Sequence, residues 1–242
     1  MRGSVRALFL SGLLLVSACD GTVEPPDWRD VEVRPDQFAL LPCGIADERP
    51  CTLIIAGGKR LLFGAPAGIA RTIRQDDLRQ LDAVILFSLD AADLEGLDEI
   101  RNLSWHAGRS EALPVIGPAG IAEIVTALNK AFEQSDARYV VEHGIPTGGY
   151  DAAILTARSG VADERVFDTG DLTVSNTLDG FRIDYRTGGL VRTAWLRICG
   201  ARDEVMLVDP EVDRVVAVTC QSDFGDYQWP LTVPIFVENE AP

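Results

Sequence analysis

The chain has 242 residues, of which 22 are Lys or Arg and 37 are Asp or Glu, so its formal charge is -15 at pH 7. Hydrophobic residues make up 47% of the chain and charged residues 24%, a balance that excludes a wholly disordered protein. The length suits one substantial folded domain. Because the negative charge would repel a phosphate backbone, the composition predicts no nucleic-acid partner.

The first residues have the pattern of an export signal. Arg2 and Arg6 form a short basic region before an apolar run over 7–16, and small residues then lead to Cys19. The run is too short to cross a bilayer, which takes about 20 residues. It resembles the lipobox of bacterial lipoproteins, in which the signal is removed before a cysteine that receives lipid. We therefore expect a lipoprotein signal peptide over 1–18 and lipidation of Cys19, which would anchor the protein to a membrane of the cell envelope, facing the periplasm. A plain secretory signal cut near Ala18 is the alternative.

Export would place the other four cysteines in an oxidising compartment. Four cysteines allow three pairings. We prefer one short loop closed by Cys43 and Cys51 and one link between neighbouring strands by Cys199 and Cys220. Buried free thiols are the alternative.

The predicted elements begin after a polar tether over 19–36, and residues 37–242 form the predicted domain. Gly57-Gly58 lies between the apolar runs 52–56 and 60–63, which indicates a β-hairpin. A polar helix is predicted over 74–81. The short apolar runs 83–87 and 113–116 are typical of strands covered on both faces.

Gly117-Pro118 opens a helix with one apolar face, because its apolar residues recur at helical spacing: Ile121, Ile124, Val125, Leu128 and Phe132. The second half is richer in strands, which are predicted over 172–174, 180–185, 190–198, 205–208 and 215–218.

The order of several short phrases resembles the metallo-beta-lactamase superfamily, specifically its ribonuclease Z-like branch. The phrases lie at 56–63, 81–86, 104–109, 113–120 and 138–144. The resemblance implies an α/β fold, an αββα sandwich of two mixed sheets with helices outside, here shortened at the C-terminus.

The resemblance also implies a metal site that has lost its ligands. The family's Thr-His-x-His-x-Asp-His signature falls on residues 87–93, where Ser88, Asp90 and Asp93 stand in place of the three histidines and Ala92 in place of the aspartate. In the family these groups hold zinc and acidify a bound water. Asp209 corresponds to the family's bridging aspartate. We therefore expect no zinc and no catalytic residues.

The two histidines have different expected roles. His143 stands before a Pro and a Gly-Tyr pair, as does a metal histidine of ribonuclease Z, but its position also fits a non-ligand histidine of a connecting loop. His106, beside Trp105, is expected to form a hydrogen bond in a loop. Trp105 is expected to cover one side of the old metal cleft, and Arg109 to lie near its aspartates.

The aspartates allow two interpretations. Asp90, Asp93 and Asp209 could converge on a manganese, magnesium or calcium ion, which prefer oxygen ligands. Alternatively, Asp90 and Asp93 begin a helix over 91–100 and cap its exposed N–H groups.

The leading hypothesis for function is a catalytically inactive metallo-beta-lactamase-like lipoprotein that acts as a binding or scaffold module for an unknown protein or small molecule. The alternative is a metal-dependent hydrolase of phosphodiester or ester substrates with a carboxylate-rich site. A purely structural envelope lipoprotein is the third class.

Overall fold

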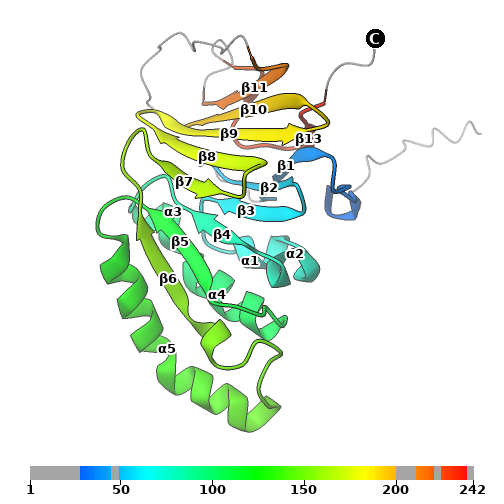
Figure 1. Cartoon of the computed structure of the whole chain (residues 1–242). Helices are drawn as coiled ribbons and strands as arrows, with labels where there is room; N and C mark the ends of the chain where they lie inside the picture. Colours follow the sequence, from blue (N-terminus) through cyan, green and yellow to red (C-terminus); the bar gives the residue numbers. More distant parts are fainter. Residues whose placement is uncertain (1–27, 45–48, 200–210, 221–224, 239–242) are drawn as a thin grey trace, which may run out of the picture.

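The computed structural model describes residues 28–44, 49–199, 211–220 and 225–238. Two β-sheets pack face to face, and helices lie along one of them (Figure 1). The first sheet has seven strands in the order β13-β1-β2-β3-β4-β5-β6, and the second has six in the order β12-β11-β10-β9-β8-β7. Cys19, Asp209 and the strand predicted over 205–208 lie outside the described residues.

The first sheet is mixed. Strands β13, β1, β2 and β3 pair in antiparallel fashion, whereas β3, β4, β5 and β6 run parallel. The predicted hairpin is confirmed, because β2 and β3 flank Gly57-Gly58. The bounds of the strands are β1 (Phe38–Pro42), β2 (Thr52–Ala56), β3 (Lys59–Phe63), β4 (Ala83–Ile85), β5 (Leu113–Gly117), β6 (Leu155–Ser159) and β13 (Ile235–Phe236).

The second sheet is also mixed. Its strands β7 to β10 are antiparallel neighbours, and β10, β11 and β12 run parallel. The bounds are β7 (Arg165–Asp168), β8 (Leu172–Thr177), β9 (Gly180–Thr187), β10 (Leu190–Arg197), β11 (Arg214–Thr219) and β12 (Tyr227–Gln228). The α/β class with two mixed sheets is thus as the sequence predicts.

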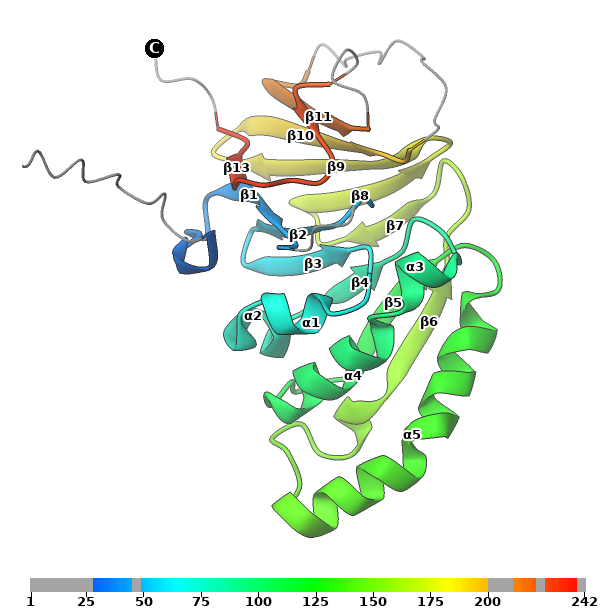
Figure 2. The same cartoon turned by 180° about the vertical axis from the view of Figure 1, so that it is seen from behind.

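The α-helices of the described chain lie on the outer side of the seven-stranded sheet (Figure 2). They are α1 (Ile69–Thr72), α2 (Gln75–Arg79), α3 (Ala91–Leu94), α4 (Leu97–His106) and α5 (Ile121–His143), with two 3-10 turns at Trp28–Asp30 and Asp151–Ala153. The described residues therefore form three layers of the expected αββα sandwich and include no helix over the second sheet. No helix among them is long and apolar enough to cross a membrane.

The core has two layers because side chains alternate along each buried strand. In β3, Leu61 and Phe63 face the second sheet, whereas Leu62 faces the helices. In α5, Ile121 and Val125 are buried against the sheet, which is the apolar face that the sequence predicts.

The start of the described chain, within the range predicted as a tether, contacts the folded domain. Residues Trp28, Val31 and Val33 pack against the core between the first sheet and the helices. These contacts remove apolar side chains of a polar stretch from water, which is favourable.

Strand β6 lies at the edge of the first sheet, beside α5 (Figure 1). The side chain of Asn129 on α5 donates a hydrogen bond from Nδ2 to the carbonyl oxygen of Leu155 at 2.8 Å. Its Oδ1 accepts one from the N–H of Leu155 at 3.0 Å. Arg158, further along β6, donates to the carbonyl oxygens of Arg165 and Val166 at 3.1 and 2.9 Å, which ties the edges of the two sheets together.

Candidate functional site

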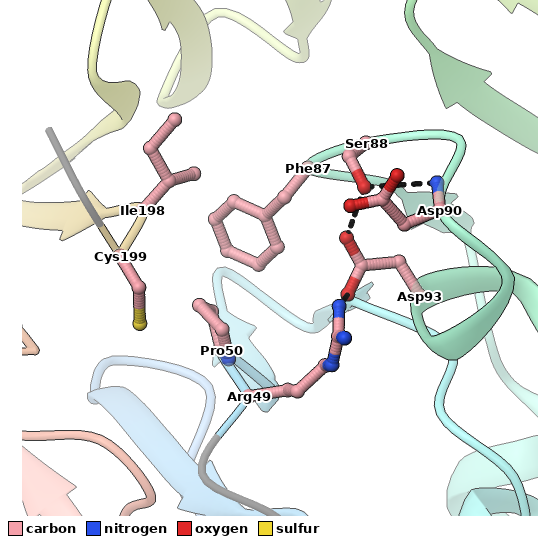
Figure 3. A pocket seen from close by; sticks show the side chains of 8 residues that line it. All are labelled: Arg49, Pro50, Phe87, Ser88, Asp90, Asp93, Ile198 and Cys199. Carbon is pink, nitrogen blue, oxygen red and sulfur yellow. Dashed lines mark hydrogen bonds and ion pairs between the residues drawn. The ribbon is translucent and has the colours of Figure 1, made fainter.

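A pocket of about 520 Å³ opens beyond the carboxyl end of strand β4. Figure 3 shows the side chains that line it. Ligand sites of α/β proteins commonly lie beyond the carboxyl ends of parallel strands. We call it the Asp93 pocket, and it is lined by Arg49, Pro50, Phe87, Ser88, Asp90, Asp93, Ile198 and Cys199.

The segment with Arg49 and Pro50 reaches the pocket because its backbone lies close to the end of β3. Gly64 follows β3 with a φ of 75°, and a Cβ atom there would lie 2.5 Å from the carbonyl oxygen of Pro50. Only glycine fits both this φ and this approach. A disulfide between Cys43 and Cys51, with Cα atoms 5.7 Å apart, closes the loop that carries Arg49.

Asp93 is the most buried carboxylate of the pocket, with 8% of its side chain exposed. The hydroxyl of Ser88 donates a hydrogen bond to its Oδ2 at 2.5 Å. Nη1 of Arg49 lies 3.7 Å from its Oδ1 (Figure 3). A buried carboxylate needs such partners, so two groups of the protein already offset the charge of Asp93.

Asp90 is exposed and directly precedes α3. Its side chain makes no capping hydrogen bond to α3. Instead, the N–H of Asp90 donates to the hydroxyl oxygen of Ser88 at 3.0 Å. Asp90 and Asp93 thus stand at the start of a helix, as predicted, with Asp90 at the N-cap position and Asp93 in the first turn. The predicted capping hydrogen bond from the side chain of Asp90 is not formed, and the carboxylate of Asp93 points toward Ser88 and Arg49.

Phe87 is an apolar lining residue of the Asp93 pocket. Its ring lies 5.3 Å from that of Phe181 and 6.3 Å from that of Trp229, measured between centroids, and so belongs to the core between the sheets. Ile198 and Cys199 line the opposite side of the pocket, just after β10 (Figure 3). A second disulfide joins Cys199 to Cys220. Both disulfides follow the pairing preferred from the sequence.

The residues at the family's signature do not fit zinc. Ala92 has no ligand atom, and the Asp93 carboxylate is engaged by Ser88 and Arg49. Within the described ranges, no three His, Cys, Asp or Glu side chains are grouped so that they could hold a metal ion. Neither of the two histidines of the chain lines the pocket, so no imidazole base adjoins the Ser88 hydroxyl. The arrangement is suited to holding a ligand with both polar and apolar parts.

The two histidines lie at the other end of α4, which is ten residues long and therefore spans about 15 Å. His106 and His143 stack on the two sides of the same ring: centroids lie 3.7 Å apart for His106 and Tyr139 and 4.6 Å apart for Tyr139 and His143. His143 is the last residue of α5 and is exposed, which places it on a helix rather than in the expected loop. Burial lowers the pKa of His106, with a smaller opposing effect of Asp136.

Trp105 and Arg109 also lie away from the Asp93 pocket, contrary to expectation. Trp105 is fully buried, and its indole N–H donates to the carbonyl oxygen of Gly149 at 2.9 Å. Arg109 donates from Nε to the hydroxyl of Ser104 at 3.0 Å. Both residues lie at the far end of α4, so they cannot cover or neutralise groups at α3.

Sequence reasoning missed Arg49, Pro50 and Ile198 as pocket residues. Arg49 and Pro50 come from the loop between the paired cysteines, and Ile198 directly follows strand β10 of the second sheet. The preferred Cys43–Cys51 pairing was the only signal near Arg49, and it predicts a tight loop without saying which strand end the loop approaches.

Comparison with known proteins finds relatives named ribonuclease Z. The protein from Mycobacterium marinum is 29% identical over 168 residues, which are 64% of this chain and 60% of that protein. The one from Mycolicibacterium gilvum is 28% identical over 153 residues, which are 59% of this chain and 53% of that protein. The chain thus spans somewhat over half the length of these relatives. No family model matches the chain.

Two solved structures resemble the chain at low identity. The short form of human tRNase Z has a TM-score of 0.48 and 12% identity, covering 80% of this chain and 84% of that one. The metallo-beta-lactamase fold protein YhfI from Bacillus subtilis has a TM-score of 0.44 and 13% identity, covering 66% of this chain and 62% of that one. The chain has an α/β fold of two mixed sheets and is similar in sequence to proteins named ribonuclease Z.

Proposed function

We propose that this chain is a non-catalytic binding module of the cell envelope, built on a metallo-beta-lactamase-like fold. One observation carries the proposal. Asp93, which stands at the position of a metal histidine in the family, is bound by the Ser88 hydroxyl and lies next to the Arg49 guanidinium. A divalent cation there would have to displace Arg49, because two cations cannot share one buried carboxylate without strong repulsion.

The shape of the pocket supports binding as its role. Its volume of about 520 Å³ lies within the range of small-molecule sites, about 300–1,000 Å³. Phe87 and Ile198 offer apolar contact, whereas Arg49 and Asp90 offer charges of both signs. The occupant that fits is a small molecule, or a short protein segment, with an apolar part and polar groups beside it.

The test is metal content together with hydrolytic activity. The purified full-length chain in detergent, after dialysis against zinc-free buffer, should hold well under one zinc per chain by mass spectrometry of the metal. It should not hydrolyse bis(p-nitrophenyl) phosphate with added zinc or manganese, whereas a ribonuclease Z assayed in parallel serves as the positive control. Stoichiometric zinc would contradict the proposal.

The hydrolase alternative gives a distinct result. Hydrolysis that depends on manganese and is lost in both Asp93→Asn and Asp209→Ala would replace the binding proposal by a carboxylate-rich metal site. Glu142→Gln, at the exposed end of α5, is the matched control, because it removes one carboxylate far from the Asp93 pocket.

A further inference from the structure

A second pocket, of about 410 Å³, lies on the side of the first sheet where its parallel strands begin, opposite the side that carries the Asp93 pocket. It opens where strands β4 and β5 begin, whereas the Asp93 pocket lies where β4 ends. Its lining comes from the β2–β3 turn, the end of α2 and the segment before β5, and includes Lys59, Arg79, Asp82, Arg109 and Glu111. We call it the Arg109 pocket.

Arg109 is a buried cation with an unused donor. The residue is 3% exposed. Its Nε donates to the Ser104 hydroxyl at 3.0 Å, and its Nη1 donates to the carbonyl oxygen of Glu111. Its Nη2 is buried and has no hydrogen-bond partner among the described residues. A guanidinium normally uses both of its terminal nitrogens to bind a carboxylate or phosphate.

No carboxylate of the described chain pairs with Arg109. The buried carboxylate of this cluster, Asp136, binds Arg101 through both oxygens, at 3.0 and 2.5 Å. Arg101 therefore has a buried carboxylate as its partner, whereas the buried guanidinium of Arg109 has none among the described residues. Burial, with a further contribution from Arg101, lowers the pKa of Arg109 to about 10, so the side chain is still a cation at neutral pH. An unpaired buried charge is costly, and a bound anion would offset that cost.

The rest of the pocket adds a second available cation. Arg79 has 49% of its side chain exposed, and its partner Asp76, at 3.4 Å, is 80% exposed, so water screens this ion pair strongly. Lys59 is less available, because its Nζ lies 2.8 Å from Asp82, whose other oxygen accepts from the N–H of Arg60. Lys59, Arg79 and Arg109 contribute three positive charges to the lining, against two negative charges from Asp82 and Glu111.

We propose that the Arg109 pocket binds a small oxyanion, a compound with a carboxylate or phosphate group. Arg79 contacts the anion directly, and Arg109 supplies the buried positive charge that makes the site attractive to it. This site is independent of the function proposed for the Asp93 pocket, because the two pockets lie at opposite edges of the sheet and share no lining residue.

The full-length chain in detergent at neutral pH is titrated with inorganic phosphate and, in a separate experiment, with succinate. The ionic strength is kept low and constant, with chloride as the balancing anion. Calorimetry measures binding, and thermal unfolding measures stabilisation. We expect saturable binding of at least one of the two anions and a higher unfolding midpoint in its presence. Phosphate binding would indicate a phosphate-bearing ligand, and succinate binding a carboxylate-bearing one.

Four variants locate the site. Arg79→Ala should weaken binding about tenfold or more, since a hydrogen bond to a charged group is lost, and Arg109→Met should abolish it. Arg138→Ala removes another exposed arginine of a surface pair, and Arg49→Ala removes the arginine of the Asp93 pocket. Both should bind as the wild type does. If Arg109→Met does not fold, Arg79→Ala decides the question.

The proposal is overturned if neither anion binds saturably, or if binding survives Arg79→Ala unchanged. It is also overturned if Arg49→Ala abolishes binding, because the anion would then occupy the Asp93 pocket, or if Arg138→Ala weakens it equally, because binding would then reflect only net charge.

Discussion

Ser88 is the residue on which the charge balance of the Asp93 pocket depends. Its hydroxyl donates to Asp93 and accepts from the N–H of Asp90. Ser88→Ala should lower the free energy of unfolding by about 1–3 kcal/mol, because a buried carboxylate loses its donor. The unfolding midpoint should fall by about 2 °C or more for a chain of this size.

The matched control for Ser88→Ala is Asp90→Asn. Asp90 is exposed, so its replacement should change the free energy of unfolding by less than about 0.5 kcal/mol. Differential scanning calorimetry of both variants checks this pair. A Ser88→Ala protein as stable as the wild type would mean that Arg49 alone satisfies Asp93.

His106 makes stability depend on pH. Burial lowers its pKa below the usual value of 6.5, so the folded state disfavours the protonated ring. The unfolded chain takes up the proton at a higher pH than the folded chain does. Stability should therefore fall as pH drops through about 6.5, and this loss is complete once pH lies below the folded pKa.

The variant His106→Gln isolates this effect. Its free energy of unfolding, measured by urea denaturation at several pH values, should lack the part of the decline that His106 causes. Because the carboxylates titrate in both proteins, their contributions cancel when the pH profile of the variant is subtracted from that of the wild type. Identical pH profiles for the two proteins would show that His106 has the same pKa in the folded and unfolded states.

At the scale of elements, one buried ion pair joins α4 to α5. Arg101 and Asp136 have side chains that are 0% and 4% exposed. Asp136→Asn should lower the free energy of unfolding by about 3 kcal/mol or more, because removal of one partner leaves a buried charge uncompensated. Denaturant unfolding measures the loss.

A surface pair on the same helix is the control for Asp136→Asn. Arg138 and Glu142 are 79% and 47% exposed, so Glu142→Gln should cost less than about 1 kcal/mol. Equal effects of the two substitutions would show that burial does not set the strength of these ion pairs.

The elements that the sequence predicts well are those with a clear local signal. Gly57-Gly58 marks the β2–β3 hairpin, and helical spacing marks α5. The helix expected over 91–100 is instead two helices separated by Gly96, where a Cβ atom would lie 2.2 Å from the carbonyl oxygen of Pro66. This contact joins residues 30 positions apart in the chain, so the spacing of apolar residues near Gly96 gives no sign of it. Strand β6 was missed because only Leu155 of its residues is buried, as befits a polar edge strand.

The candidate site could be predicted only in part. The resemblance to the family's signature grouped Ser88, Asp90 and Asp93, and the structure brings these residues to one pocket. Arg49 could not be placed, because its position depends on a loop that crosses to the end of another strand. Trp105 and Arg109 were expected at this pocket, but the order of phrases does not give distances in space, and α4 separates these residues from α3 by about 15 Å.

At the scale of the whole molecule, the family resemblance implies the two mixed sheets with helices on both sides, whereas strand patterning alone predicts only that some strands are covered on both faces. The seven-stranded sheet is buried on both faces, between the helices and the second sheet. Its inner strands β2, β4 and β5 therefore read as apolar runs. Whether helices cover the second sheet depends on long-range packing, which short runs of residues do not reveal.

Attachment to the envelope is a prediction for the whole chain. The wild-type protein should fractionate with membranes, and Cys19→Ala should release it or leave the signal uncleaved, since acyl chains on one cysteine supply the anchor. Membrane fractionation with immunoblotting, and mass spectrometry of the N-terminal peptide, check this. A wild-type protein found wholly in the soluble periplasmic fraction would contradict lipidation.

The contacts that Asn129 makes with β6 have a consequence for chains held close together on one surface. An uncovered edge strand recruits strands from neighbouring molecules, which leads to aggregation. The amide of Asn129 occupies both the donor and the acceptor of Leu155, as an added strand would. Arg158 bonds to the adjoining sheet beyond it. A crowded neighbouring copy would have to break the Asn129 bonds before it could pair with β6 at Leu155.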